Sequence, residues 1–125
     1  MKSTIKKLPD TEFEVMQAIW RSPTPATRSD VEVLLKDTHP MALTTLLTIL
    51  TRLADKEFIR IEKEGRTSRY YALVAEQDYL AAQGNRFFNK LCGGNLKTFA
   101  TALCDSGLTK EDLAELRELL EREEL

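Results

Sequence analysis

Apolar side chains recur at helical spacing through the first 56 residues, in stretches separated by proline-containing breaks. Asp10 precedes the first stretch and can cap a helix N-terminus. Thr27 and Asp30 have the spacing of a capping box before the second stretch. The pattern predicts three helices: Thr11–Arg21, Arg28–Asp37 and Met41–Lys56.

After the third helix the period changes from helical to alternating. In Phe58–Glu64 the residues Ile59 and Ile61 share one face, which is the pattern of a half-buried strand. Gly65–Ser68 can turn the chain, and Arg69–Val74 supplies a second strand rich in aromatic and β-branched residues. Three helices and a hairpin predict a winged helix-turn-helix domain over residues 1–74.

From Glu76 the apolar spacing is helical again as far as Gly93-Gly94. Leu96–Cys104 predicts a short helix, and Thr109 with Asp112 caps a final one. Short helices cannot bury their apolar faces against one another alone. Residues 75–125 are therefore expected to pair with a second copy as a helical dimerisation domain. The predicted interface residues are Tyr79, Phe87, Phe88, Leu91, Leu113, Leu116 and Leu120. The predicted fold class is therefore mainly α-helical with a small β-hairpin wing and a C-terminal helical segment.

The third helix carries leucines on one side and threonines on the other. Threonine is a poor helix former, so helix propensity does not explain this composition. The face has no acidic residue before Asp55 and suits close approach to a polyanion. The predicted DNA contacts are Thr45 and Thr48 on base edges, and Thr44, Arg52, Arg66 and Arg69 on the phosphate backbone. The alternative is a merely solvated helix face and hairpin tip.

Charge is distributed unevenly along the chain. The net charge is −2, but residues 1–74 carry twelve Lys/Arg against ten Asp/Glu, and residues 75–125 carry six against ten. A mildly basic half beside an acidic half fits a DNA reader with a separate association segment. With 42% hydrophobic and 30% charged residues, the chain is expected to be soluble and globular.

The residue types that build metal and redox sites are sparse. Cys92 and Cys104 lie far apart, which argues against a disulfide framework or a zinc site and fits a reducing cytoplasm. We expect both to be small buried apolar residues, with a thiol or metal sensor as the alternative. His39, the single histidine, is expected to be a surface or capping residue. Neither a signal peptide nor a membrane span is expected.

Other function classes fit less well. Catalysis is not expected, because the sequence offers neither a nucleophile–base pair nor a phosphate-cradling glycine loop. A winged-helix protein-interaction module would call for an apolar or acidic face on the third helix. The residues alone do not separate a repressor from an activator.

Four segments, in order along the chain, resemble the penicillinase and methicillin-resistance repressor family (BlaI/MecI), which includes copper-responsive relatives. They are Thr11–Trp20, Thr45–Leu53, the wing segment Lys63–Arg66 with Tyr70, and Phe87-Phe88 leading into Gly93–Leu96. The resemblance implies a dimeric repressor on an inverted-repeat operator in double-stranded DNA. It also implies a link to antibiotic resistance. No cofactor or metal is expected.

The family's site residues carry over by position. Thr45 and Thr48 match base-contacting residues of the third helix, Arg52 matches an arginine of that helix, and Arg66 matches one at the wing tip. Glu57 stands where relatives commonly have glycine at the helix end.

The resemblance also bears on how repression is relieved. The penicillinase repressors are inactivated when a regulatory protease cuts an Asn-Phe step, and the corresponding step here is Ala102-Leu103. The inducing signal therefore stays open between that protease, a different protease and a ligand. A copper switch is disfavoured because the chain ends without a cysteine-rich segment.

Overall fold

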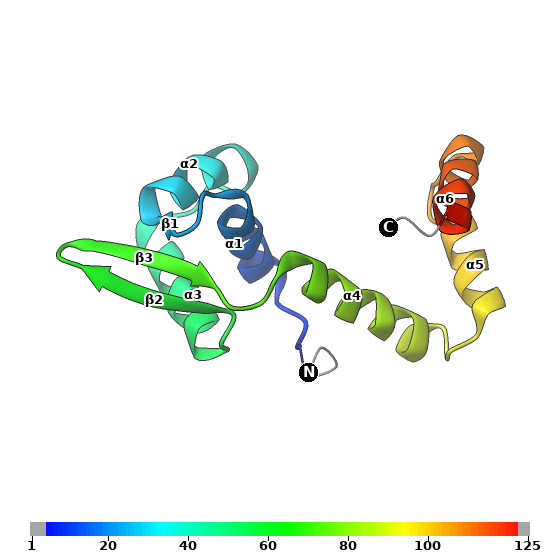
Figure 1. The fold of residues 1–125 in the computed structure, drawn as a ribbon, viewed down its shortest axis with the longest axis horizontal. Coiled ribbons are helices and arrows are strands. Elements are labelled where there is room, and N and C mark those ends of the chain that lie inside the picture. Colours follow the sequence, from blue (N-terminus) through cyan, green and yellow to red (C-terminus); the bar gives the residue numbers. More distant parts are fainter. Residues whose placement is uncertain (1–4, 123–125) are drawn as a thin grey trace. The chain divides into compact units, whose positions relative to one another are not determined.

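The computed structural model describes residues 5–122, which divide into two compact units on either side of the Ala82–Gln83 bond. The first unit contains three helices, a small sheet and the start of a fourth helix (Figure 1). Its elements in chain order are α1 (Asp10–Arg21), β1 (Ala26–Thr27), α2 (Arg28–Thr38), α3 (Leu43–Asp55), β2 (Ile59–Glu64), β3 (Thr67–Ala72) and α4 (Glu76–Arg86). Among the described residues, no helix is long and apolar enough to cross a membrane.

The sheet is antiparallel with strand order β1-β3-β2. Glu64 pairs with Thr67, so β2 and β3 are joined by a turn of two residues, Gly65 and Arg66. Gly65 has a φ of 63°, a conformation that glycine adopts without steric cost. Because the turn is this tight, β3 begins two residues earlier than the sequence pattern predicts. The β2–β3 hairpin is the wing, and it extends beyond the helices of its unit (Figure 1).

The core of the first unit lies where α1, α2 and α3 face the base of the wing. Its fully buried side chains come from all of these elements, and they are Leu8, Val15, Met16, Val31, Leu46, Leu50, Leu53 and Ile59. On the wing, Ile59 is buried, but Ile61 is 37% exposed. On the other strand Tyr70, which pairs with Ile61, is 3% exposed, so burial on the wing reaches as far as this pair and the tip beyond it is mostly exposed.

Tyr79 belongs to this core, which corrects its assignment to the dimer interface. It is 3% exposed, stacks on Phe13 with ring centroids 5.4 Å apart, and accepts a hydrogen bond from the Leu8 amide at 2.9 Å. Trp20 and Phe58 complete an aromatic cluster around it. The first unit consequently extends into α4 and past residue 74, where we expected the domain to end.

The ends of α2 and α3 show how local sequence sets helix limits. Thr27 and Asp30 form the predicted capping box, each side chain accepting from the other residue's backbone N–H. At the end of α3, Phe58 N–H donates to the Leu53 carbonyl and Glu57 N–H to the Ala54 carbonyl. This is the Schellman motif, and Glu57 occupies its left-handed position with a φ of 63°. Glu57 therefore takes a left-handed conformation that glycine adopts more readily.

Two helix starts differ from the predictions. Asp10 is the first residue of α1 rather than its cap, because Pro9 occupies the cap position and makes no side-chain bond there. The third helix begins at Leu43 rather than Met41, since Ala42 at its cap position is extended. Two-residue β1 is an addition that the pattern did not predict.

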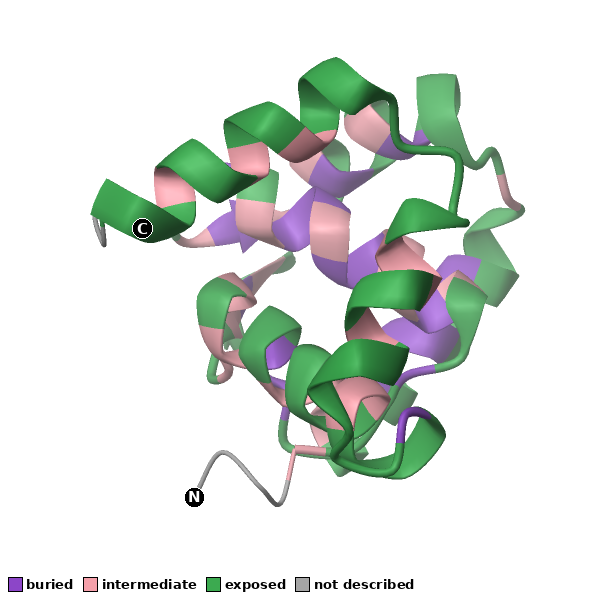
Figure 2. Cartoon of the chain, turned by 90° about the vertical axis from the view of Figure 1, so that its right-hand side faces the viewer, coloured by how far each residue is buried: buried purple, intermediate pink, exposed green. Residues whose placement is uncertain are grey.

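The second unit is helical. After α4 the chain makes a π-helical turn, Phe87–Leu91, and continues as α5 (Leu96–Cys104) and α6 (Lys110–Arg122). The rings of Phe87 and Phe88 meet Phe99 edge-on at 5.7 and 5.5 Å. No residue of α5 or α6 is buried, and the helix that leads to the C-terminus is green and pink throughout in Figure 2. Cys92 is buried, but Cys104 is exposed, which corrects half of the cysteine prediction.

Candidate nucleic-acid interface

Helix α3 divides cleanly into a buried and an exposed face. Leu46, Ile49, Leu50 and Leu53 anchor it in the core. Thr44, Thr45 and Thr48 are exposed on the other side, with Arg52 one turn further on. Since α3 presents no acidic side chain before Asp55, this threonine face has hydroxyls, methyls and one cation to offer a ligand.

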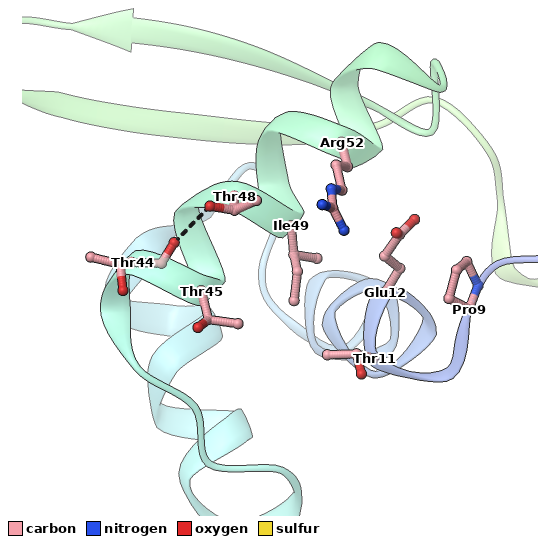
Figure 3. A pocket seen from close by; sticks show the side chains of 8 residues that line it. All are labelled: Pro9, Thr11, Glu12, Thr44, Thr45, Thr48, Ile49 and Arg52. Carbon is pink, nitrogen blue, oxygen red and sulfur yellow. Dashed lines mark hydrogen bonds between the residues drawn. The ribbon is translucent and has the colours of Figure 1, made fainter.

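A shallow cavity of about 490 Å³ runs between this face and the first turn of α1 (Figure 3). Its lining combines the predicted α3 residues with the start of α1, and it consists of Pro9, Thr11, Glu12, Thr44, Thr45, Thr48, Ile49 and Arg52. The structure thus brings together four of the six predicted DNA-contacting residues. The cavity is called the α1–α3 cavity below.

The threonine hydroxyls are not equivalent. Thr48 Oγ1 donates to the Thr44 carbonyl at 3.0 Å, as the dashed line in Figure 3 shows. This hydroxyl proton is therefore used within the helix, and Thr48 presents oxygen lone pairs and a methyl group outward. The hydroxyl of Thr45 makes no such bond to a described residue, so Thr45 can donate as well as accept.

Glu12 is an acidic residue in this cavity that sequence reasoning did not single out. Its side chain is 6% exposed and accepts a hydrogen bond from Lys56 Nζ at the end of α3. A buried carboxylate needs such a partner. In Figure 3 Arg52 points toward Glu12, but no described acidic residue forms an ion pair with Arg52. The carboxylate is satisfied by Lys56, which leaves Arg52 available to an anion.

The wing cations divide into paired and unpaired ones. Arg69 Nε donates to Glu64 at 2.8 Å, and this bond raises the pKa of Arg69 above its usual value. Arg60 pairs with Glu62 at 2.7 Å and lies over the Tyr71 ring, 4.4 Å from its centroid. Arg66, at the tip, has no acidic partner among the described residues. The two predicted wing contacts thus differ, with Arg66 free and Arg69 already bound.

The second unit has an apolar groove of about 370 Å³ between α5 and α6. It is lined from both helices by Ala100, Leu103, Cys104, Leu113, Leu116, Arg117, Leu120 and Glu121. Three of the predicted dimerisation residues thus lie together here. Leu91 is 74% exposed elsewhere in the unit, whereas Phe87 and Phe88 are half-buried against Phe99. Leu103 of the predicted cleavage step also lines the groove, so that step lies inside α5.

Comparison with known sequences gives a consistent result. A family model described as penicillinase repressor matches residues 8–122. The penicillinase repressor of Bacillus licheniformis is 31% identical over 121 residues, covering 94% of each chain. The methicillin resistance regulatory protein MecI of Staphylococcus aureus (strain N315) is 28% identical over 125 residues, covering 98% of this chain and 99% of that one.

Comparison with solved structures identifies the same group. The solution structure of the Bacillus licheniformis BlaI monomeric form in complex with the blaP half-operator matches with a TM-score of 0.51 and 33% identity. The match covers 61% of this chain and 92% of that one. The DNA-binding domain of the repressor BlaI matches equally well, with 60% and 94% covered. These likenesses confirm the predicted winged-helix fold class.

Proposed function

The chain belongs to the penicillinase repressor family, and from this membership we propose that it is a transcriptional repressor that binds double-stranded DNA. The family is one of repressors and not of enzymes. The observation that carries the proposal is the threonine face of α3, exposed opposite an anchored apolar face. A helix of this kind fits the major groove of B-DNA, where every base pair presents a distinct pattern of donors and acceptors.

In this proposal Thr45 and Thr48 read base edges. Thr48 uses its own proton within α3, so it accepts from the amino group of adenine or cytosine or packs its methyl against thymine. Thr45 can take either role. The assignment gives each threonine a different set of compatible bases.

Arg52, Arg66 and Thr44 position the protein on the phosphate backbone. The two arginines support this role because neither has an acidic partner among the described residues, and contacts of this kind fix register without reading sequence. Arg69 remains a predicted contact, but its Nε–H already donates to Glu64 and the carboxylate offsets its charge, so it contributes less.

The repressor acts as a homodimer on an inverted-repeat operator. The α5–α6 groove supports a self-association surface because its leucines lie open in the single chain. A two-fold dimer places two α3 helices about 34–36 Å apart, one helical turn of DNA. Since one unit offers few cations to DNA, tight binding comes from holding two half-sites together.

Relief of repression acts through the second unit. A regulatory protease that cuts at Ala102-Leu103 must first open α5, because proteases bind extended backbone and this step is helical. Opening α5 would dismantle the groove and release the operator. Any signal that separates the dimer has the same consequence.

The test is selection of the full-length protein against random duplex DNA at about 0.15 M salt, where non-specific binding is weakened. We expect an inverted repeat with half-site centres about 10–10.5 base pairs apart, or a multiple of that spacing. Enrichment of single half-sites would contradict the dimer. No enrichment from a folded sample would contradict sequence-specific binding and favour a protein-interaction module.

A further inference from the structure

A second, smaller cavity of about 170 Å³ lies on the other flank of α3. Its lining comes from the start of α2, from α3 and from the tip half of the wing, and it consists of Thr27, Arg28, Ser29, Leu47, Arg66, Thr67, Ser68 and Tyr70. Leu47 belongs to α3 but to neither its threonine face nor its core face, and it is 41% exposed. The cavity is called the α2–wing cavity below.

The lining has the chemistry of an anion site. It contains two arginines, five hydroxyl-bearing residues and no acidic residue. Arg66 has no acidic partner among residues 5–122. Arg28 pairs with Glu32 at 3.3 Å, but both side chains are about half exposed, so the pair is weak and exchangeable.

The remaining polar groups leave donors available. Thr27 is occupied in the capping box, and Tyr70, which also lines the cavity, is buried. Ser29 and Thr67 make no side-chain hydrogen bond to a described residue. Two arginines and two free hydroxyls therefore surround a space that accommodates one tetrahedral anion.

The position of this cavity indicates which anion it holds. A helix in the major groove, about 12 Å wide, has a sugar–phosphate backbone on each side. The α1–α3 cavity with Arg52 flanks one side of the threonine face, and the α2–wing cavity flanks the other. We propose that the α2–wing cavity binds one phosphodiester group of the DNA backbone, held by Arg28 and Arg66 and oriented by Ser29 and Thr67. This inference rests on the proposed function.

The test uses the operator selected by the wild-type dimer and duplexes that carry one neutral methylphosphonate at a time. The variants are Arg28→Gln, Arg66→Gln and the double variant. Arg21→Gln is the matched control, because Arg21 is also a half-exposed arginine paired with a glutamate, Glu76, in the same unit. Thermal unfolding of each variant shows that it is folded.

Three results are expected. Each single variant lowers operator affinity, and the slope of log affinity against log salt becomes shallower by up to about 0.9 per half-site. One methylphosphonate position that weakens the wild type weakens each single variant less and the double variant least, because both arginines contact the same phosphate. The cavity variants keep the base preferences of the wild type. The control Arg21→Gln keeps the wild-type operator affinity.

Other results would overturn the inference. Variants that keep the wild-type salt slope, or that become insensitive at two different phosphates, would show that the cavity holds no shared phosphate group. Specific displacement of the wild type by inorganic phosphate at constant ionic strength, absent in the double variant, would assign the cavity to a free anion. If the wild type itself selects no operator, the proposed function fails before the cavity is tested.

Discussion

Glu57 shows how a residue other than glycine can occupy a left-handed backbone position at a helix end. The Schellman motif needs a left-handed residue directly after the α3 cap, and Glu57 adopts that conformation at a φ of 63°. A residue with a Cβ pays about 1–2 kcal/mol there, which glycine avoids. The motif holds because Leu53 and Phe58, which it joins, are both buried.

Replacing Glu57 with glycine should therefore stabilise the protein. We expect Glu57→Gly to raise the free energy of unfolding by about 1 kcal/mol, measured by urea denaturation. Glu57→Ala is the control, because it removes the same charge but retains the Cβ and should bring no such gain. Equal stabilisation by both variants would trace the effect to charge rather than to backbone conformation.

Individual site residues were predictable where their role depends on their own helix. The exposed face of α3 follows from helical periodicity, and both capping boxes, Thr27/Asp30 and Thr109/Asp112, are hydrogen-bonded as predicted. Glu12 and Tyr79 were not predictable in the same way. Glu12 is hydrogen-bonded to Lys56 and Tyr79 to Leu8, and those partners are 44 and 71 residues away in sequence.

At the scale of elements, prediction succeeded for segments with strong local signals. Helix α5 has the predicted bounds, because Asn95 caps it and the stretch after Cys104 stops it. Strand β1 was missed because two residues carry no period, and they become a strand only by pairing with β3. The domain limit at residue 74 differs from the division after Ala82 because Tyr79 of α4 packs on α1.

The α5–α6 groove offers a test of the link between association and DNA binding. Leu120 lines the groove and is 55% exposed, so Leu120→Glu should leave the single chain folded. Buried in a dimer interface, the added charge should cost about 2–4 kcal/mol and raise the dimer dissociation constant more than tenfold. Sedimentation equilibrium measures this change.

The affinity for the operator should fall when the dimer dissociates. Leu120→Glu is expected to bind the full operator more weakly while retaining wild-type affinity for a half-operator. Glu118→Gln is the control, since Glu118 is exposed on α6 and does not line the groove. A monomeric Leu120→Glu protein with wild-type operator affinity would show that association and DNA binding are not coupled.

At the scale of the whole molecule, the proposed repressor has DNA binding in its first unit and self-association in its second. The first unit carries the threonine face and the two cavities that flank it, and the second carries an apolar groove. The acidic half of the sequence coincides with the helical tail, and the mildly basic half coincides with the unit that carries the threonine face. This division explains why the overall charge of −2 is compatible with a DNA-binding protein.

The central claim is that Thr45 and Thr48 read bases, and the most direct measurement is the ratio of affinities for the selected operator and a scrambled duplex. At about 0.15 M salt we expect a wild-type ratio of at least about 10³. Thr45→Ala/Thr48→Ala should lower that ratio by about tenfold or more, because each good contact to a base edge discriminates by about 1–3 kcal/mol.

The appropriate control is Thr38→Ala. Thr38 is another exposed helical threonine that donates to the carbonyl four residues earlier, at 3.2 Å, and it lies outside the threonine face. It should keep the wild-type ratio, and scrambled DNA should bind all three proteins alike. A double variant that retains the wild-type ratio, or that loses affinity equally for both duplexes, would contradict base reading by α3.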